Sequence, residues 1–301
     1  MPGILWMASY PKSGNTWLRA FIANYLKNPA EPMPIDDLPQ FILGDGIATP
    51  FEQVAGGPGD AMTAEEIQAL RPKVHEMVAQ SSPDTVFVKT HNAISVLDNI
   101  PTITPDATAG AIYVVRNPLD VAVSYAHHYG ISYDRAIAAM DSEETTAPLH
   151  GNQVYQYLGS WSTHVRSWTQ AEGLKLHTIR YEDMTIQPEK TWRALIKFLG
   201  LPLETPRLKK AIKFSSFKVL ANQEKEDGFV EAVPIDNRVF FRKGKTGAWR
   251  KELTAGTMLI WPGNLLHAVS AYAGTKPRIT IAWNINDREL PGSLGDAFKS
   301  A

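Results

Sequence analysis

The sequence predicts an α/β fold, with a mainly parallel sheet that is P-loop-like at its first strand and carries helices on both faces. Short runs that are apolar throughout recur along the chain, and most are followed by a longer stretch with helical spacing. An uninterrupted apolar run suits a strand buried on both faces, as strands of a parallel sheet are. The first run, residues 4–9, leads through a Gly-containing turn into a helix-like stretch, as in phosphate-binding folds.

The predicted strands and helices alternate along the chain. Thr63 followed by Glu66 predicts a capping box at the start of a helix. Gly200 followed by Pro202 predicts a helix end. Residues 28–62 are rich in Pro and Gly and are expected to form a long loop or lid. We expect strands over residues 4–9, 85–90, 110–116 and 174–180, and helices over 16–26, 63–80, 118–130, 154–171 and 188–201.

The chain is expected to divide at residue 250. Residues 1–250 would form the α/β domain and residues 251–301 a C-terminal β appendage, with two strands around a turn. The appendage would pack on the core or mediate contacts in a homodimer. Its sequence faintly resembles the last strands of iron- and 2-oxoglutarate-dependent oxygenases, on His267 and Arg278. The upstream His-x-Asp/Glu motif of that family is absent from the chain, so no working iron site is expected.

Composition limits the classes of function. Lys and Arg number 30 against 31 Asp and Glu, so charge does not favour nucleic acid as the main partner. There are no cysteines, which excludes disulfides, thiolate zinc sites and a cysteine nucleophile. No apolar run approaches the roughly 20 residues that span a bilayer. A cytoplasmic protein without a membrane span is expected.

The turn after the first strand has the features of an anion site. Its sequence, YPKSGNTW, spans residues 10–17 and ends as a helix begins. The first N–H groups of a helix lack partners within it and attract anions. Gly14 permits a close approach of backbone to ligand, and Lys12 adds a charge, although it lies before the glycine and not after it as in the GxxxxGK[ST] loop.

This octapeptide resembles the 5′-phosphosulfate loop of the sulfotransferases, usually written YPKSGTTW. These enzymes use 3′-phosphoadenosine-5′-phosphosulfate as the sulfuryl donor. Seven of the eight positions match, and Asn15 stands where the first Thr is usual, which replaces a hydroxyl with an amide. The resemblance implies that the donor is bound by Lys12, Ser13, Gly14, Asn15, Thr16 and Trp17.

Two further segments resemble the elements that hold the donor's 3′-phosphate in this family. In YVVRNPLDVAVSYAHH, residues 113–128, the resemblance assigns this role to Arg116 and Ser124. In FFRKGKTGAWR, residues 240–250, it assigns Arg242, Lys243 and Gly244 to a loop that closes over the same phosphate. Ala248 replaces the usual Asp of that loop.

The segment VKTHNAI, residues 88–94, resembles the family's KTH element. The resemblance implies that His91 removes the proton of the acceptor, and Lys89, its companion in the motif, would join Lys12 in stabilising the leaving phosphate. His91 follows a predicted buried strand, where open α/β sheets place their ligands. His127 and His128 are adjacent, which is a poor spacing for two ligands on one helix face, and are interpreted as structural.

Weaker segments would surround the adenine. IRYEDM resembles the family's YEDM and implies Tyr181 near the base. SSFKVL resembles TSFxxM and implies Ser215 and Phe217 around it, with Trp17 on the other side. Flat aromatic faces suit a purine.

The resulting hypothesis is in-line transfer of a sulfuryl group to a hydroxyl or amine of a small, hydrophobic acceptor. Lys12 would neutralise charge on the leaving phosphate, and no metal is expected because the terminal group carries less charge than a phosphate. Two alternatives stay open: a P-loop kinase, and a non-catalytic adenosine 3′,5′-bisphosphate binding protein. The acceptor pocket would come from residues 28–62 and 129–160, with the candidates Phe41, Phe51, Tyr129, Tyr133 and Tyr155.

Overall fold

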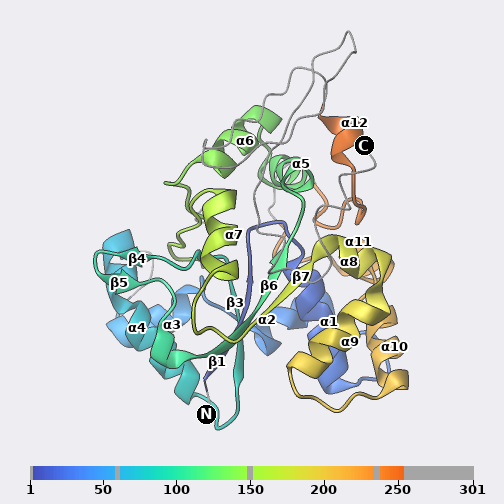
Figure 1. Cartoon of the computed structure of the whole chain (residues 1–301), viewed down its shortest axis with the longest axis horizontal. Helices are drawn as coiled ribbons and strands as arrows, with labels where there is room; N and C mark the ends of the chain where they lie inside the picture. The colour runs from blue at the N-terminus through green and yellow to red at the C-terminus, as the bar shows by residue number, and fades with distance from the viewer. Residues whose placement is uncertain (1–2, 58–61, 148–151, 233–237, 254–301) are drawn as a thin grey trace. The chain divides into compact units, whose positions relative to one another are not determined.

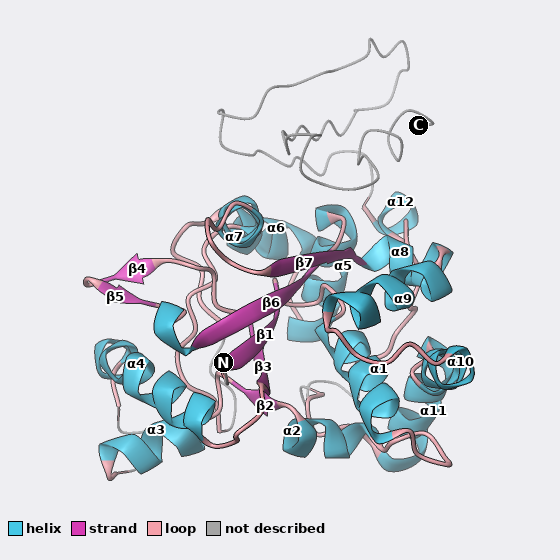
Figure 2. Ribbon diagram, turned by 60° about the horizontal axis from the view of Figure 1, so that its bottom comes forward, coloured by secondary structure: helices cyan, strands magenta, loops and turns pink. Residues whose placement is uncertain are grey.

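The structure is a computed structural model that describes residues 3–57, 62–147, 152–232 and 238–253. Five strands, all paired in parallel, form its central sheet in the order β2-β3-β1-β6-β7 (Figures 1 and 2). The predicted α/β class with a parallel sheet is therefore confirmed. These strands are β1 (Ile4–Ser9), β2 (Leu43–Gly44), β3 (Val86–Thr90), β6 (Thr108–Val115) and β7 (Leu176–Arg180), and a separate antiparallel pair is formed by β4 (Val96–Leu97) and β5 (Ile100–Pro101).

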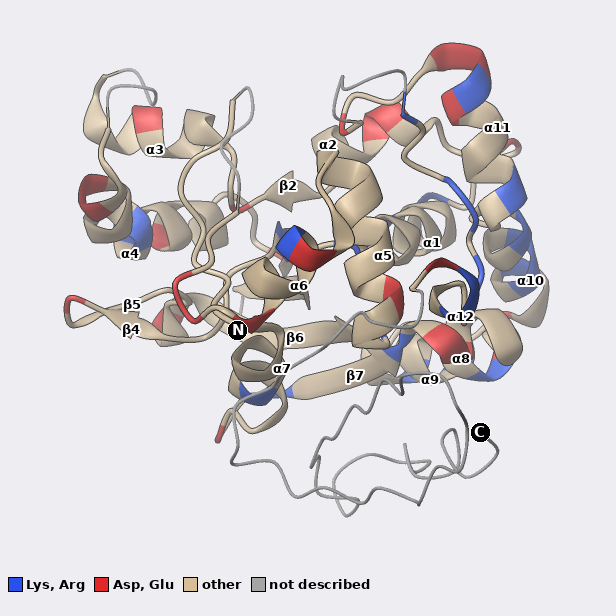
Figure 3. Ribbon diagram, turned by 90° about the horizontal axis from the view of Figure 1, so that it is seen from above, with Lys and Arg blue, Asp and Glu red and all other residues tan. Residues whose placement is uncertain are grey.

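Helices connect the strands. The capping box at Thr63 and Glu66 is present, and Gly200 has a positive φ of 68° directly after a helix, as predicted. The helices are α1 (Asn15–Lys27), α2 (Leu38–Phe41), α3 (Ala48–Ala55), α4 (Ala64–Gln80), α5 (Pro118–Tyr129), α6 (Tyr133–Asp141), α7 (Trp161–Thr169), α8 (Tyr181–Ile186), α9 (Pro188–Phe198), α10 (Thr205–Phe214) and α11 (Phe217–Asp227), with single 3₁₀ turns η1 (Ile35–Asp37) and η3 (Pro105–Ala107). Figure 3 shows that α10 carries Lys and Arg without Asp or Glu.

Both faces of the sheet are covered, which explains why its strands are apolar throughout. Leu5 and Met7 of β1 point to the side of α1 and α9, where Trp192 completes a buried cluster. On the other face, the ring centres of Trp6 and of His75 in α4 lie 4.9 Å apart. The ring centres of Tyr113 and of Trp168 in α7 lie 5.9 Å apart. The two helical layers thus hold the sheet rigidly between them (Figure 2).

Two predicted segments differ from the structure. Residues 28–62 were expected to form a loop, but their described part contains η1, α2, α3 and the edge strand β2. Residues 154–171 were expected to form one helix, but only Trp161–Thr169 is helical. Gly159 has a positive φ of 62°, and the side chain of Ser160 caps α7 by accepting from the Thr163 N–H, so the helix begins there.

The chain divides into two compact units, Met1–Ala248 and Trp249–Ala301. The second unit contains the short helix α12 (Trp249–Glu252). Residues 254–301 lie outside the described part, so the β appendage, His267 and Arg278 stay predictions.

Candidate active site

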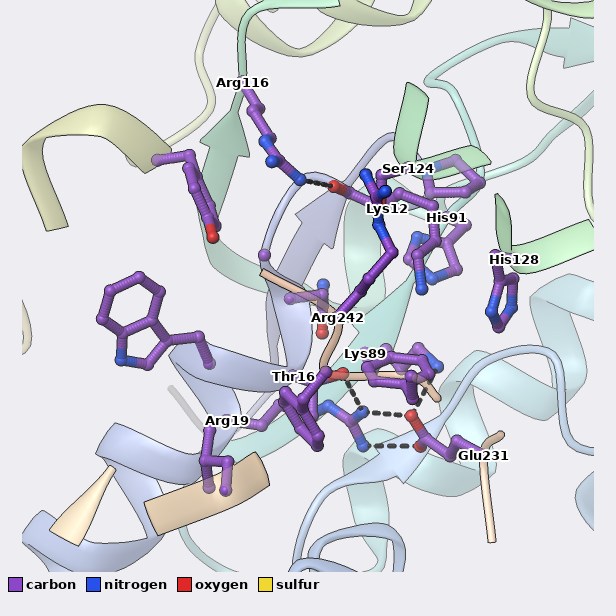
Figure 4. Close-up of a pocket in the computed structure, with 18 of the residues that line it drawn as sticks. Lys12, Thr16, Arg19, Lys89, His91, Arg116, Ser124, His128, Glu231 and Arg242 are labelled. Atoms are coloured by element: carbon purple, nitrogen blue, oxygen red, sulfur yellow. Dashed lines mark hydrogen bonds and ion pairs between the residues drawn. The ribbon is translucent and has the colours of Figure 1, made fainter. Parts of the chain in front are cut away.

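A cavity of about 490 Å³ is lined by residues that directly follow three neighbouring strands. Lys12 follows β1, His91 follows β3 and Arg116 follows β6, and Figure 4 shows them around one space. Open α/β sheets bind ligands at this edge. The other predicted site residues that line the cavity are Gly14, Asn15, Thr16, Trp17, Lys89, Ser124, Tyr181, Phe217, Arg242, Lys243 and Gly244.

Ser13 and Ser215 do not line this cavity. Ser13 is buried, and its hydroxyl has no hydrogen-bond partner among the described residues. The Ser215 hydroxyl donates to the Ala211 carbonyl at 2.8 Å, at the end of α10. The structure therefore brings neither hydroxyl to the cavity, and Ser215 is a helix-terminal residue.

The loop between β1 and α1 is held by Asn15. Its side-chain amide donates to the Met7 carbonyl at 2.7 Å and lies 3.3 Å from the Ser9 hydroxyl. Asn15, at the position where the family usually has Thr, thus ties the loop back to the strand. The N–H groups of its side-chain amide are used in these contacts and are not free for a ligand. Helix α1 has no side-chain cap at its N-terminus, so its first backbone N–H groups stay available for an anion.

Gly14→Ala is expected to destabilise the fold and weaken nucleotide binding. Gly14 has φ 105°, and a Cβ there would lie 2.6 Å from Cδ2 of the Tyr181 ring, which lines the cavity. The left-handed conformation alone costs about 1–2 kcal/mol for a residue with a Cβ. Gly56, with φ 73° and no atom within 4 Å of such a Cβ, is the matched control. Thermal unfolding of both variants measures the difference, and equal losses would contradict the role given to the Tyr181 contact.

Lys12 lies in the loop with a positive φ of 66°. Its ammonium is 3.7 Å from the centre of the Phe240 ring. Burial, and then the nearby Arg116, lower the pKa of Lys12 to about 7. An anion beside this lysine would favour its protonated form, so ligand binding and lysine protonation are coupled.

Arg116 is fixed to the same loop. Its NH1 donates to the Lys12 carbonyl at 2.9 Å, and its guanidinium carbon lies 4.2 Å from the centre of the Tyr181 ring. Its Nε is buried without a hydrogen-bond partner among the described residues. A guanidinium held in this way, with Ser124 on the same cavity wall, suits a phosphate.

The segment that follows Phe240 lies against α5. Arg242 NH1 lies 2.8 Å from Nε2 of His127, and the Gly247 N–H donates to Asp120 Oδ2 at 2.7 Å. A Cβ on Gly244 would lie 2.2 Å from Cδ2 of the Phe217 ring, so only glycine lets the segment pass this close. Arg242 and Lys243 are thereby held on the cavity.

His91 is held in one tautomer. Its Nδ1 lies 2.7 Å from the Ser9 carbonyl, which can only accept, so Nδ1 donates and Nε2 is the basic nitrogen. Its backbone is fixed by Gln156, which accepts from its N–H at 3.1 Å, and by His164, whose Nε2 donates to its carbonyl at 3.0 Å. Burial, and then Lys89, lower the pKa of His91 to about 3. The imidazole is therefore neutral at ordinary pH and available as a base.

A buried carboxylate holds the residues on either side of His91. Asp45 accepts from the Thr90 hydroxyl at 2.8 Å and from the Asn92 amide at 2.6 Å. It also pairs with Arg71 at 3.4 Å and His75 at 3.0 Å. Burial alone would raise the pKa of Asp45, but Arg71 and His75 hold it well below its usual range. The network keeps the loop after β3 in one position.

The sequence reasoning missed an ion pair that lines the cavity. Arg19, one turn into α1, pairs with Glu231 through NH1–Oε1 at 2.8 Å and NH2–Oε2 at 2.5 Å. Glu231 Oε2 also lies 3.6 Å from the Lys89 ammonium. Glu231 lies outside every motif, so no local pattern could have indicated it, whereas Arg19 is one helical turn after Thr16.

The structure places one of the two histidines that were interpreted as structural, His128, on the wall of the cavity. His128 lines the cavity, and burial, followed by Lys12, holds its pKa well below its usual range. His127 contacts Arg242. His128 therefore faces the cavity directly, whereas His127 reaches it only through Arg242.

Both segments expected to form the acceptor pocket reach the cavity, but mostly through other residues. Of the five aromatic candidates only Tyr129 lines it. Phe51 is fully buried, with its ring 5.6 Å from the Arg71 guanidinium. The wall instead comes from the extended residues 152–156 and from β2 and its neighbours, namely Pro39, Ile42, Gly44, Ile47, Asn152, Gln153 and Gln156.

Metal and membrane sites were searched over the same described ranges. They contain no group of three or more His, Cys, Asp or Glu side chains that could hold a metal ion. None of the helices found there is long and apolar enough to cross a bilayer.

Known proteins with similar sequences are sulfotransferases. Sulfotransferase 1B1 of Mus musculus is 26% identical over 261 residues, which cover 84% of this chain and 78% of that protein. Sulfotransferase 1B1 of Canis lupus familiaris is 29% identical over 84% of this chain and 79% of its own. Flavonol 3-sulfotransferase of Flaveria bidentis is 27% identical over 84% of this chain and 77% of its own.

Solved structures share the fold. Mouse sulfotransferase SULT7A1 complexed with PAP has a TM-score of 0.53 at 21% identity, covering 84% of this chain and 80% of its own. Retinol dehydratase in complex with androsterone and inactive cofactor PAP has a TM-score of 0.56 at 19% identity, covering 83% and 76%. The sulfotransferase domain family matches residues 2–258. On this match, which covers most of the chain and all of the cavity, the protein belongs to the sulfotransferase family.

Proposed function

We propose that this enzyme transfers the sulfuryl group of 3′-phosphoadenosine-5′-phosphosulfate to a hydroxyl or amine of a small, mainly hydrophobic acceptor. One observation carries the proposal. Cationic side chains from three separate segments, Lys12, Arg116 and Arg242, line the same cavity as the neutral imidazole of His91. A nucleotide with anionic groups at both ends could contact all three cations, whereas a single phosphate could not.

The cavity walls fit this donor. Arg116, Ser124, Arg242 and Lys243 would bind the 3′-phosphate. The helix α1 N-terminus, with Thr16 and Lys12, would bind the 5′ end. The rings of Trp17 and Tyr181, whose centres lie 5.6 Å apart with the rings edge to face, would lie around the adenine together with Phe217. The two solved relatives that contain PAP support this choice of nucleotide.

The chemistry would use Nε2 of His91, Lys12 and Lys89. His91 accepts the proton of the acceptor as the acceptor's oxygen or nitrogen attacks sulfur. The bond between sulfur and the bridging oxygen breaks, and its electron pair stays on the 5′-phosphate. Lys12 and Lys89 stabilise this charge. The products are the sulfated acceptor and adenosine 3′,5′-bisphosphate, with no metal ion needed as a reactant.

The acceptor side supports a compact and largely apolar molecule. Ile42, Ile47 and Val123 face the cavity beside Tyr129. Retinol dehydratase was solved with androsterone and retinol, which are small alcohols of this kind. We therefore propose phenols, flavonols, sterols and alkyl amines as the first classes to examine.

Labelled donor mixed with this acceptor panel tests the proposal. We expect a sulfated product together with an equal amount of adenosine 3′,5′-bisphosphate. The two alternatives predict other outcomes. A bisphosphate-binding protein would retain the nucleotide without turnover on any acceptor, and a kinase would instead bind ATP with Mg²⁺ and transfer phosphate.

A further inference from the structure

We propose that Glu231 is a positioning residue for sulfuryl transfer, which holds the Lys89 ammonium and, through Arg19, the Thr16 hydroxyl ready for the anionic end of the donor. Glu231 lies on the segment after α11 and lines the cavity. The inference rests on the proposed function, because the donor end that Lys89 and Thr16 would serve is the one assigned above.

The carboxylate of Glu231 connects two cations. Arg19 approaches it with both terminal nitrogens, at 2.8 and 2.5 Å, which fixes the plane of the carboxylate. Lys89 Nζ lies 3.6 Å from the oxygen that Arg19 NH2 also contacts. The Arg19 side chain is only 1% exposed, so its guanidinium cannot turn away into solvent. Figure 4 shows the three side chains on one side of the cavity.

Arg19 also reaches the first turn of α1. Its NH2 donates to the Thr16 hydroxyl oxygen at 3.1 Å. A hydroxyl has a single proton, and an oxygen that already accepts from Arg19 is left to donate that proton elsewhere. Thr16 lines the cavity, where a phosphate oxygen would be the acceptor. Glu231 thus sets the orientation of a hydroxyl that it does not contact.

The carboxylate also sustains the charge of the lysines. Burial is the largest cause that lowers the pKa of Lys12 and of Lys89, and Glu231 opposes it in both cases. Burial alone would raise the pKa of Glu231, but Lys89 and Arg19 hold it well below its usual range. The charged and titratable groups that act on this lysine pair are Arg19 of α1, Arg116 after β6, His91 after β3, His128 of α5, Glu224 of α11 and Glu231 itself.

Two alternative roles of Glu231 predict a different dependence of nucleotide binding on pH from the proposed role. A carboxylate among cations could compete with the donor for Lys89, and then its removal would strengthen nucleotide binding at every pH. It could also merely hold the segment after α11 in place, and then its removal would weaken binding by the same factor at every pH. The proposed role alone predicts an effect that changes sign with pH.

Glu231→Gln tests this by calorimetric titration with adenosine 3′,5′-bisphosphate between pH 6 and 8.5. At pH 6, the lowest pH of the series, protonation of the lysines is favoured most, and the variant is expected to bind at least as tightly as wild type because one repelling charge is gone. Removing the carboxylate lowers the pKa of both lysines further, because Glu231 opposes the effect of burial in both cases. Affinity that depends on a protonated lysine falls as pH rises above its pKa, so at pH 8.5 the variant should bind more weakly than wild type, by up to about tenfold.

Controls separate the outcomes. The ratio of variant to wild-type affinity cancels the titration of the nucleotide itself. Glu226→Gln removes the same charge from an exposed position of α11 and should follow wild type. Glu231→Asp keeps the charge but withdraws it by one methylene, so it should keep the wild-type pH dependence while transferring the sulfuryl group several-fold more slowly.

A ratio that does not change with pH, in either direction, would overturn the proposal. So would loss of the folded state in Glu231→Gln and Glu231→Asp but not in Glu226→Gln, because the role would then be structural. Failure of the wild type to bind the bisphosphate is a separate result, which would overturn the proposed function.

Discussion

Replacing His91 with alanine is expected to lower the single-turnover rate of sulfuryl transfer by about 10²–10⁴-fold, the usual contribution of a positioned general base. The structure supports this because Nδ1 donates to the Ser9 carbonyl and leaves Nε2 as the basic nitrogen. Binding of the bisphosphate should stay close to wild type, because none of the proposed phosphate contacts involves His91. Rapid-quench measurement with bound donor and excess acceptor separates the two effects.

His177→Ala is the matched control, because His177 lies on β7 with its ring stacked on Phe198, and it does not line the cavity. An unchanged rate in His91→Ala would contradict the assignment of the base. The pH profile adds a second check. Because burial and Lys89 lower the pKa of His91 to about 3, the base stays neutral as pH falls from 8 to 5, and the rate should show no loss near pH 6.5.

Replacing Lys12 with methionine is expected to lower the rate by about 10²–10³-fold, as removal of one group that stabilises developing charge does. Methionine fills much of the same space beside Phe240 and removes only the charge. Single-turnover measurement at saturating donor reports the loss. Lys209→Met removes a lysine at an exposed position of α10 that does not line the cavity, and it should have no effect.

Lys12 should also make donor affinity depend on pH. The pKa of Lys12 is lowered to about 7 in the free enzyme, so the side chain loses its proton as pH rises above 7, and donor affinity should weaken in that direction. The dependence should become weaker in Lys12→Met, where only Lys89 and the nucleotide itself still titrate. If the variant kept both the wild-type rate and the wild-type pH dependence, the leaving-group role of Lys12 would be wrong.

Local patterns predicted the framework of the fold well. The strands β1, β3, β6 and β7 are mainly apolar because both sheet faces are covered, and the turn of residues 10–14 is bounded by a continuous apolar run and by a stretch with helical spacing. Residues 154–160 were predicted to be the first part of a helix, but the helix begins only at Trp161. In the structure Ile47 pairs with Gln153, and the Val154 N–H donates to the Gly46 carbonyl.

The site was predictable where it follows motifs and not where it depends on pairing across the fold. Lys12, His91 and Arg116 each follow a strand, so the topology alone places them at one edge. The hydrogen bond from the Asn15 side chain to the Met7 carbonyl of β1 could not be predicted from the place of Asn15 in the motif. Glu231 reaches Lys89 only through the path of the chain after α11, and the burial that makes this pairing necessary is a property of the folded protein.

The most direct test of the account is a calorimetric comparison of adenosine 3′,5′-bisphosphate with adenosine 5′-monophosphate and with ATP-Mg²⁺. The account predicts that the bisphosphate binds about 10–100-fold more tightly than the monophosphate, from charge-assisted bonds to its 3′-phosphate, and that Arg116→Ala removes most of this preference. Equal binding of bisphosphate and monophosphate, or tighter binding of ATP-Mg²⁺, would contradict it.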